Sequence, residues 1–220
     1  MNDYFVYDFL NGQTIDAHNY FGAHAENRDG KDGFVFRLYA PLASDVSVIG
    51  DFNNWDYGAN KLDKIHDCGI WETFIPGVVN YQHYKFHFKT CRHNYVDKAD
   101  PYAFFSELRP GSCSRTFNIK DFAWHDDDWL RTRTRNFDKP MSIYEMHLGS
   151  WKGTAEDGHV PSYEEISEPL IKYVKENGFT HVEFMPLCQY PFDGSWGYQA
   201  TGFFSIDSRY GNPFQLMCLI

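Results

Sequence analysis

The sequence predicts two folds in succession: an antiparallel β-sandwich in the first half and the start of a parallel α/β domain in the last third. The first half contains short runs of alternating apolar and polar residues separated by turn residues, which is typical of a sandwich. The last third has a strand, helix, strand pattern in which the strands are almost continuously apolar. At ~150 residues per domain, 220 residues allow one domain and part of another.

Four apolar runs are expected to be strands of the sandwich: residues 34–40, 46–49, 71–75 and 81–88. In the last run, Tyr84, Phe86 and Phe88 fall on one face, and Lys85 and His87 on the other. Residues 50–56 are expected to form a turn, and residues 100–118, which have no clear period, a covering loop. Residues 121–139 combine charged side chains, Arg135 among them, with Trp124 and Trp129, which indicates a connector that docks through its aromatic rings.

The α/β region begins near Pro140. Residues 141–148 and 180–187 are expected to be buried strands. Between them, residues 162–165 fit a capping box and Asn177-Gly178 a helix stop. Because proline breaks helices, the sequence predicts a short turn first and then a main helix capped by Ser167, with Pro169 in its first turn. A second helix is expected over residues 213–220.

Composition limits the function. The formal charge is −10 and no Lys/Arg cluster breaks the acidic pattern, so nucleic acid and anionic membranes are not expected partners. No signal peptide or apolar span is evident, and the five scattered cysteines form no metal or redox motif, so a cytoplasmic protein with free thiols is expected. Aromatic residues make up 19% of the chain, more than core packing needs, and flat rings suit flat ligands.

Several long strings of residues resemble one known family. The segments FRLYAP, VSVIGDFNNW and YKFHF look like a carbohydrate-binding module of family 48. The segments DPYAFFSELRPGSCS, MSIYEMHLGSW, FTHVEFMPL and PFDGSWGYQATGFFSIDSRYGNP resemble bacterial 1,4-α-glucan branching enzymes of glycoside hydrolase family 13. The resemblance covers nearly the whole chain.

The resemblance implies a multidomain β plus α/β protein, in which an immunoglobulin-like sandwich precedes the truncated start of a (β/α)8 barrel. The expected parts are an N-terminal arm, the family-48 sandwich, a connector and the first two strands and helices of the barrel, at residues 1–25, 26–118, 119–139 and 140–220. The family enzymes cleave α-1,4-glucan chains and transfer them to form α-1,6 branches in glycogen. The expected partner is therefore glycogen or another α-glucan, with no cofactor and no metal. A monomer is expected, although the sequence leaves the oligomeric state open.

By resemblance, the catalytic Asp nucleophile, Glu acid/base and second Asp lie on later barrel strands, past Ile220. No catalytic residue is assigned in this chain, and residues 1–220 alone are expected to be inactive. Tyr198 is implied as the ring that stacks on a sugar, with Asp193, Trp196 and Gln199 shaping the same wall, because barrel sites are built from loops after the strands. The alternative is that Trp196 and Tyr198 only pack the loop.

In the sandwich, Trp55 and Lys85 match the glucan-binding positions of family-48 modules, and Tyr95 approximates the second aromatic platform. The hairpin at residues 90–94 is longer than the family pattern. Trp55 could instead pack under its own turn, and the module could mainly brace the barrel. A non-catalytic glycogen-binding module is therefore the rival function.

One further pattern involves Glu145 with His147 and His181 with Glu183, which share faces of the two buried strands. A Glu-x-His pair can bind a metal or transfer protons. Buried polar residues of barrel strands are more often hydrogen-bonded core groups, and this is the interpretation that we favour.

Overall fold

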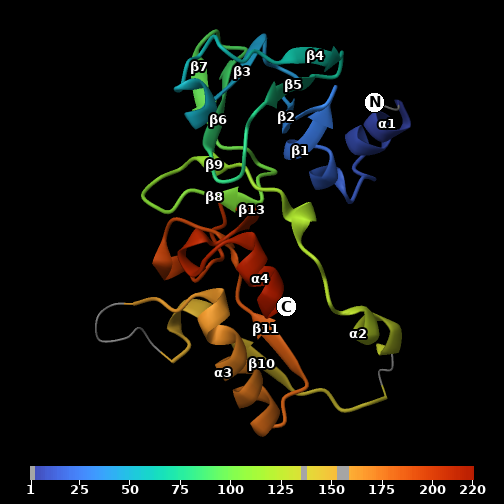
Figure 1. Ribbon diagram of the computed structural model, residues 1–220, viewed down its shortest axis with the longest axis vertical. Coiled ribbons are helices and arrows are strands. Elements are labelled where there is room, and N and C mark those ends of the chain that lie inside the picture. The colour runs from blue at the N-terminus through green and yellow to red at the C-terminus, as the bar shows by residue number, and fades with distance from the viewer. Residues whose placement is uncertain (1–2, 135–137, 153–158) are drawn as a thin grey trace. The chain divides into compact units, whose positions relative to one another are not determined.

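The computed structural model describes residues 3–134, 138–152 and 159–220 (Figure 1). The chain divides into two compact units. Unit 1 comprises residues 1–107 and 111–118, and unit 2 comprises residues 108–110 and 119–220. Each unit is described by itself.

Unit 1 contains a four-stranded sheet in the order β1-β2-β5-β4 and a five-stranded sheet in the order β3-β6-β9-β8, with β7 also paired to β6. All of these pairs are antiparallel. The strands are β1 (Gly22–Arg28), β2 (Lys31–Tyr39), β3 (Asp45–Gly50), β4 (Asp63–His66), β5 (Ile70–Pro76), β6 (His83–Lys89), β7 (Tyr95–Lys98), β8 (Phe105–Ser106) and β9 (Ser114–Arg115). The antiparallel sandwich expected from the sequence is confirmed.

The core of unit 1 lies between the two sheets. Phe36 from β2 and Tyr84 from β6 are fully buried, and their ring centroids are 5.1 Å apart. Phe86 and Phe88 of β6 belong to the same cluster, so the predicted alternation along β6 is confirmed. Lys85 and His87 consequently project from the opposite, outward face of this sheet.

The N-terminal segment is packed against the first sheet. Helix α1 (Asp3–Leu10) and the 3-10 turn η1 (Ala17–Asn19) contribute to a second buried cluster around Phe21 and Ile70. Strand β1 begins at Gly22, four residues before the boundary expected between the arm and the sandwich. The last residues of the expected arm therefore belong to the first sheet.

Residues 100–118 are not only a covering loop, as the sequence led us to expect. They contain β8 and β9, and β9 pairs with the first residues of β6. Asp100 and Ser114 are buried, and the Asp100 amide donates a hydrogen bond to Ser114 Oγ over 2.8 Å. Two-residue strands carry no period that a sequence pattern could show.

Unit 2 contains a parallel pair of strands, an antiparallel pair and several helices. Its strands and α-helices are α2 (Asp127–Thr132), β10 (Ile143–Met146), α3 (Tyr163–Glu176), β11 (His181–Phe184), β12 (Cys188–Gln189), β13 (Gly202–Ile206) and α4 (Pro213–Leu219). Its 3-10 turns are η3 (Ile119–Asp121), η4 (Leu148–Ser150), η5 (Asp193–Ser195) and η6 (Ser208–Tyr210). The expected strand, helix, strand order is present, and the described residues form this short α/β segment and no closed barrel.

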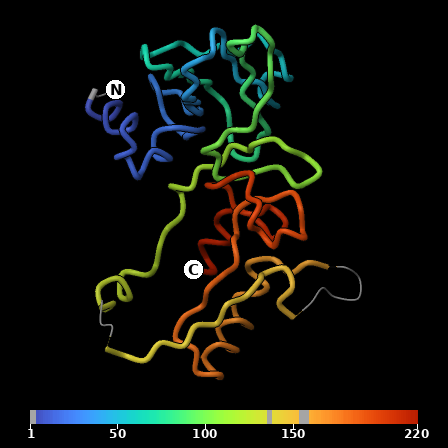
Figure 2. The backbone as a smooth tube through the Cα atoms, turned by 180° about the vertical axis from the view of Figure 1, so that it is seen from behind, coloured from blue at the N-terminus to red at the C-terminus, as the bar shows by residue number. Residues whose placement is uncertain are grey.

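Helix α3 lies along the β10–β11 pair, and Figure 2 gives the view from behind (Figures 1 and 2). Met146 of β10 and Phe184 of β11 pack in one cluster with Ile166 and Leu170 of α3. The opposite face of the pair carries Ile143, which is 50% exposed. The strands that the sequence led us to expect as buried are therefore buried on one face only, the face toward α3, because this chain supplies one helix to cover two strands.

The expected cap at Ser167 is also wrong. Helix α3 runs without a break through Pro169 and starts at the capping box, in which Ser162 Oγ accepts from the Glu165 amide and Glu165 accepts from the Ser162 amide. Pro169 lies on the exposed side, so the helix loses one internal hydrogen bond there but keeps its buried face. The helix stop at Asn177-Gly178 is confirmed, with Gly178 at φ +74°.

The connector contains the short helix α2, on which Trp129 is exposed. Trp124 packs edge-on against Phe122, whose ring also contacts Phe214 of α4. Arg135 lies outside the described residues. The helices that the structure describes are too short or too polar to cross a bilayer.

Candidate functional site

Trp55 lies in the turn that follows β3, two residues after the end of the 3-10 turn η2 (Asp51–Asn53). Its backbone is left-handed, with φ +61°, which is rare for a bulky residue and costs about 1–3 kcal/mol. The turn is held by the Trp55 amide, which donates to Gly50 O over 2.9 Å, and by the indole Nε1, which donates to Asp51 Oδ1 over 3.2 Å. Trp55 is 36% exposed, so part of the residue is open to solvent.

Asp51 connects this turn to β6. Its Oδ2 accepts from the His83 amide over 2.8 Å and pairs with His83 Nδ1 over 2.9 Å. Burial alone would raise the pKa of Asp51, but the hydrogen bonds from His83 hold it below its ordinary value. The carboxylate therefore fixes the indole of Trp55 beside the first residue of β6.

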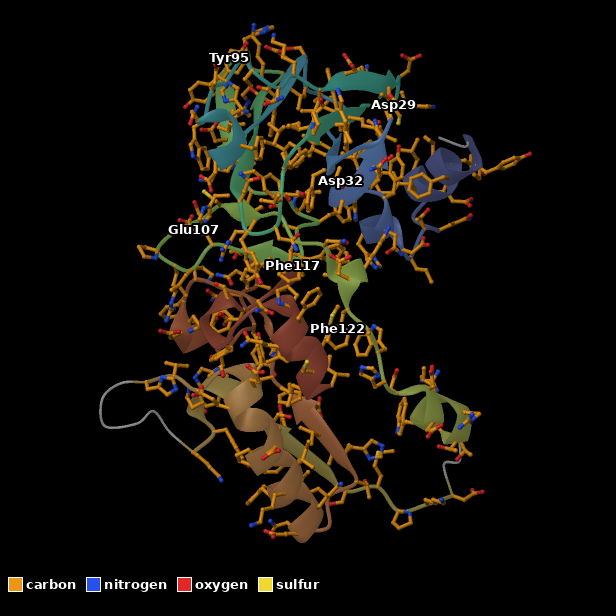
Figure 3. The ribbon with its side chains drawn as sticks, in the orientation of Figure 1. Asp29, Asp32, Tyr95, Glu107, Phe117 and Phe122 are labelled. Carbon is orange, nitrogen blue, oxygen red and sulfur yellow. The ribbon has the colours of Figure 1, made fainter. Side chains whose placement is uncertain are left out.

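Lys85 and Tyr95 lie farther along the same outward face. Lys85 Nζ donates to Ser112 Oγ over 3.0 Å. Tyr95, labelled in Figure 3, stacks on His87 with centroids 4.8 Å apart and planes 5° apart. Its hydroxyl donates to Asp45 Oδ2 over 3.1 Å, so a side chain from β7 reaches across β6 to β3.

The three sandwich residues predicted from the sequence are thus brought to one face of one sheet. Trp55 is linked to His83 through Asp51, and the ring of Tyr95 stacks on His87. Lys85 lies between His83 and His87 on β6. With a strand rise of about 3.3 Å per residue, His83 and His87 are about 13 Å apart. Exposed rings with an ammonium group between them suit a neutral polyhydroxyl chain, because sugar rings stack on aromatic faces while hydroxyls bond polar neighbours.

The second candidate site is the loop after β11. Trp196 lies at φ +54°, and Gly197 follows at φ +92°. A Cβ on Gly197 would come within 2.4 Å of Pro186 O, so this position requires glycine. Trp196 is 55% and Tyr198 is 67% exposed, and Gln199 is exposed too. Both rings therefore present surface to solvent in this chain.

Asp193, expected to line the sugar-facing wall, is held by two arginines. Arg109 Nη2 donates to Asp193 Oδ2 over 2.6 Å, and Arg209 Nη1 donates to Oδ1. The hydrogen bond from Arg109 and the charge of Arg209 keep the pKa of Asp193 below its ordinary value. Both carboxylate oxygens of Asp193 accept hydrogen bonds from these arginines, and these contacts hold the loop in place.

Arg209 is the centre of a buried cluster in unit 2. It forms hydrogen bonds through Nε with both carboxylate oxygens of Asp207, at 2.9 and 3.0 Å, and its guanidinium carbon lies 4.1 Å from the centre of the Tyr190 ring. His147 pairs through Nε2 with Tyr190 Oη over 3.2 Å, and its ring lies 5.9 Å from that of Trp196. Burial, together with the positive charge of Arg209, lowers the pKa of His147.

Arg109, Tyr190, Asp207 and Arg209 were missed as site residues from the sequence. Arg109 lies 84 residues before Asp193, so no local spacing could have shown the pair. The Asp-x-Arg spacing of residues 207 and 209 was a usable signal, since a short polar turn places both side chains at one end of β13.

Of the four residues in the Glu-x-His pattern, only His147 is partly buried, and its hydrogen bonds to Ser150 and Tyr190 agree with the interpretation that we favoured. Glu145 and Glu183 are direct partners across the β10–β11 pair, and both are exposed, as is His181. Within residues 3–134, 138–152 and 159–220, no group of three or more His, Cys, Asp or Glu side chains is placed to hold a metal ion.

Comparison with known proteins identifies two similarities. Residues 20–103 match the family model of carbohydrate-binding module 48, described as the isoamylase N-terminal domain. The chain is also 48% identical to a 1,4-alpha-glucan branching enzyme of Clostridium perfringens, over 96% of this chain and 32% of that protein. The corresponding enzyme of Francisella tularensis subsp. novicida is 46% identical, over 98% of this chain and 34% of that protein. The chain spans about a third of the length of the curated relatives it matches.

Solved structures agree on the fold alone, because their sequences are only 21% identical. A pullulanase from Bacillus acidopullulyticus superposes with a TM-score of 0.67 over 92% of this chain and 28% of its own. A candidate alpha amylase from Salmonella typhimurium gives a TM-score of 0.70 over 91% of this chain and 30% of its own.

Proposed function

We propose that this chain, which is homologous to the N-terminal third of the 1,4-α-glucan branching enzymes, is the N-terminal portion of an enzyme that cleaves α-1,4-glucan chains and transfers them to form α-1,6 branches in glycogen. Unit 1 binds the α-glucan, and unit 2 begins the catalytic (β/α)8 barrel. The whole protein acts in the cytoplasm and needs no cofactor, as the sequence leads us to expect.

The observation that carries glucan binding is the outward face of β6. Trp55, Lys85 and Tyr95 lie along it, within the region that matches carbohydrate-binding module 48. The strained backbone of Trp55 adds support. A left-handed backbone at tryptophan lowers the stability of the fold, and strain of this kind is typical of residues that contact a ligand.

In the whole enzyme, Tyr198 contacts a sugar at the cleavage site, with Trp196 and Gln199 beside it. The exposure of both rings at the end of a barrel-type strand supports this role. Asp193 shapes the same wall indirectly, by fixing the loop through Arg109 and Arg209.

Retaining transfer requires two carboxylates about 5 Å apart across the scissile bond, one as nucleophile and one as acid/base. By resemblance to the family, both are expected on later strands, so we assign no catalytic residue to this chain. Purified residues 1–220 should leave the iodine spectrum of amylose unchanged, with boiled protein as control. A change in that spectrum would show that the chain carries its own catalytic pair.

The rival function, a stand-alone glycogen-binding module, is less well supported. Such a module has no need for unit 2, whereas the similarity to branching enzymes extends over 96–98% of the chain.

Glycogen co-sedimentation of residues 1–220 tests the binding role. Trp55→Ala should weaken binding at least about fivefold, because it removes a stacking ring from the face of β6. Trp129→Ala is the matched control, since Trp129 is an exposed ring on α2 in unit 2 and should not affect binding. Equal sedimentation of the wild type and Trp55→Ala would show that Trp55 only packs its own turn.

A further inference from the structure

Three rings, those of Tyr57, His87 and Tyr95, are grouped on the outward face of the second sheet of unit 1, and Tyr57 is the one that the sequence did not lead us to expect there. The ring of His87 lies between those of Tyr57 and Tyr95, with centroid distances of 4.4 Å to Tyr57 and 4.8 Å to Tyr95. Tyr57 is 56% and Tyr95 is 50% exposed, whereas the His87 side chain is only 14% exposed. The two tyrosines therefore form the accessible surface, and the imidazole lies between them.

Tyr57 is positioned by its backbone. Ser47 is the partner of His87 in the β3–β6 ladder, and its buried hydroxyl donates to Tyr57 O over 2.8 Å. The chain after η2 is therefore tied down over β3, next to His87. Tyr57 reaches the face of β6 from a loop, whereas Tyr95 reaches it from the opposite side, from β7.

His87 is fixed independently of the tyrosines. Its Nδ1 pairs with Asp97 over 2.6 Å, and Asp97 is its direct partner in the β6–β7 ladder. The hydrogen bond sets the orientation of the imidazole, and the parallel stack then sets that of Tyr95. Because His87 is nearly covered, it can affect a ligand only through the rings it supports.

The charges around these rings are balanced. Asp45 pairs with Lys61 over 3.1 Å, Asp97 pairs with His87, and Lys89 Nζ lies 5.9 Å from the centre of the Tyr95 ring. A surface with paired carboxylates and amines around open aromatic rings gives no net attraction to an ionic ligand. It does offer hydroxyl groups both hydrogen-bond donors and acceptors.

We propose that Tyr57 and Tyr95, held by His87 between them, form one aromatic platform for an α-glucan chain. Tyr57 is a further contact residue, and His87 is a positioning residue. The platform lies on the same outward face of β6 as Trp55 and Lys85. This inference therefore rests on the proposed glucan binding by unit 1.

Two substitutions at His87 distinguish the contribution of its ring from that of its hydrogen bond to Asp97. His87→Asn keeps a polar partner for Asp97 but removes the ring, and should weaken glycogen co-sedimentation of residues 1–220 about 3- to 10-fold. His87→Phe keeps a ring between the tyrosines but removes the hydrogen bond, and should retain at least half of the wild-type affinity. Thermal unfolding followed by circular dichroism confirms that each variant is folded.

Tyr57→Ala should weaken binding by about the same factor as His87→Asn, because it removes a stacking surface. Tyr7→Ala is the matched control, since Tyr7 is an equally exposed ring on α1 and should leave sedimentation unchanged. Tyr57→Ala and His87→Asn variants that are folded and bind like the wild type, while Trp55→Ala has lost binding, would overturn the platform but leave the proposed function intact. A wild-type chain that does not sediment with glycogen would overturn both.

Discussion

The sheets of the two units differ in how many of their faces are covered. In unit 1, two sheets enclose one core, and α1 adds a second buried cluster with residues of the first sheet. In unit 2, the β10–β11 pair has α3 on one face and exposed side chains on the other. A strand pair covered on one face buries about half the apolar surface of a closed layer, so we expect unit 1 to be the more stable of the two.

The open face of unit 2 is unfavourable in a second way. Glu145 and Glu183 are direct neighbours across the strand pair, so two like charges lie side by side. In unit 1, by contrast, the cross-strand partners Arg37 and Glu72 carry opposite charges, and their Nε and Oε2 atoms are 2.5 Å apart. The open face of the β10–β11 pair therefore combines exposed apolar side chains with neighbouring like charges.

Matched core substitutions should give the largest difference between the units. Phe36→Ala removes a fully buried ring that packs on Tyr84 and Phe52, and should cost about 3–5 kcal/mol of unfolding free energy. Ile143→Ala lies on the open face and should cost less than about 1 kcal/mol. Urea unfolding followed by circular dichroism measures both. A cost for Ile143→Ala equal to that of Phe36→Ala would mean that the open face is covered in solution.

Asp100 should give a smaller, pH-dependent effect that is confined to unit 1. Burial raises its pKa to about 6, although its hydrogen bond from Tyr84 Oη, at 2.6 Å, opposes the shift. Because the folded pKa exceeds the unfolded value of about 3.9, protonation of Asp100 stabilises the fold below pH ~4, and this stabilisation is lost as the pH rises through 6.

Relative to Asp100→Asn, which cannot ionise, the wild type should therefore lose about 2–3 kcal/mol of unfolding free energy between pH 4 and pH 7. Urea unfolding of both proteins at each pH measures the difference, and subtraction removes the contribution of every other titrating group. A difference that stays constant with pH would show that Asp100 does not ionise with a raised pKa in the fold.

Much of unit 1 could be predicted from the sequence because its pattern is periodic. The alternation in β6 assigns Phe86 to the core and Lys85 to the outward face, and the structure agrees. The short strands β8 and β9 could not be predicted, since their pairing depends on β6. The break expected before Pro169 failed because the buried face of α3 outweighs one lost hydrogen bond.

Residues of the candidate site could be predicted only where they occupy a position in a sequence motif. Trp55, Lys85 and Tyr95 were predicted from motif positions and lie on one face. The partners that hold such residues come from distant segments: Arg109 reaches Asp193, and Ser47 fixes Tyr57. These contacts exist only once the chain is folded, so no local spacing indicates them.

Hydrogen exchange of residues 1–220 tests the contrast between the units most directly. We expect the amides of β10 and β11 to be protected at least about 100-fold less than those of β2 and β5, because an open strand pair unfolds locally while the sandwich opens only as a whole. Equal protection in the two units would contradict the claim that the β10–β11 pair is an open sheet, whereas the sheets of unit 1 enclose a core.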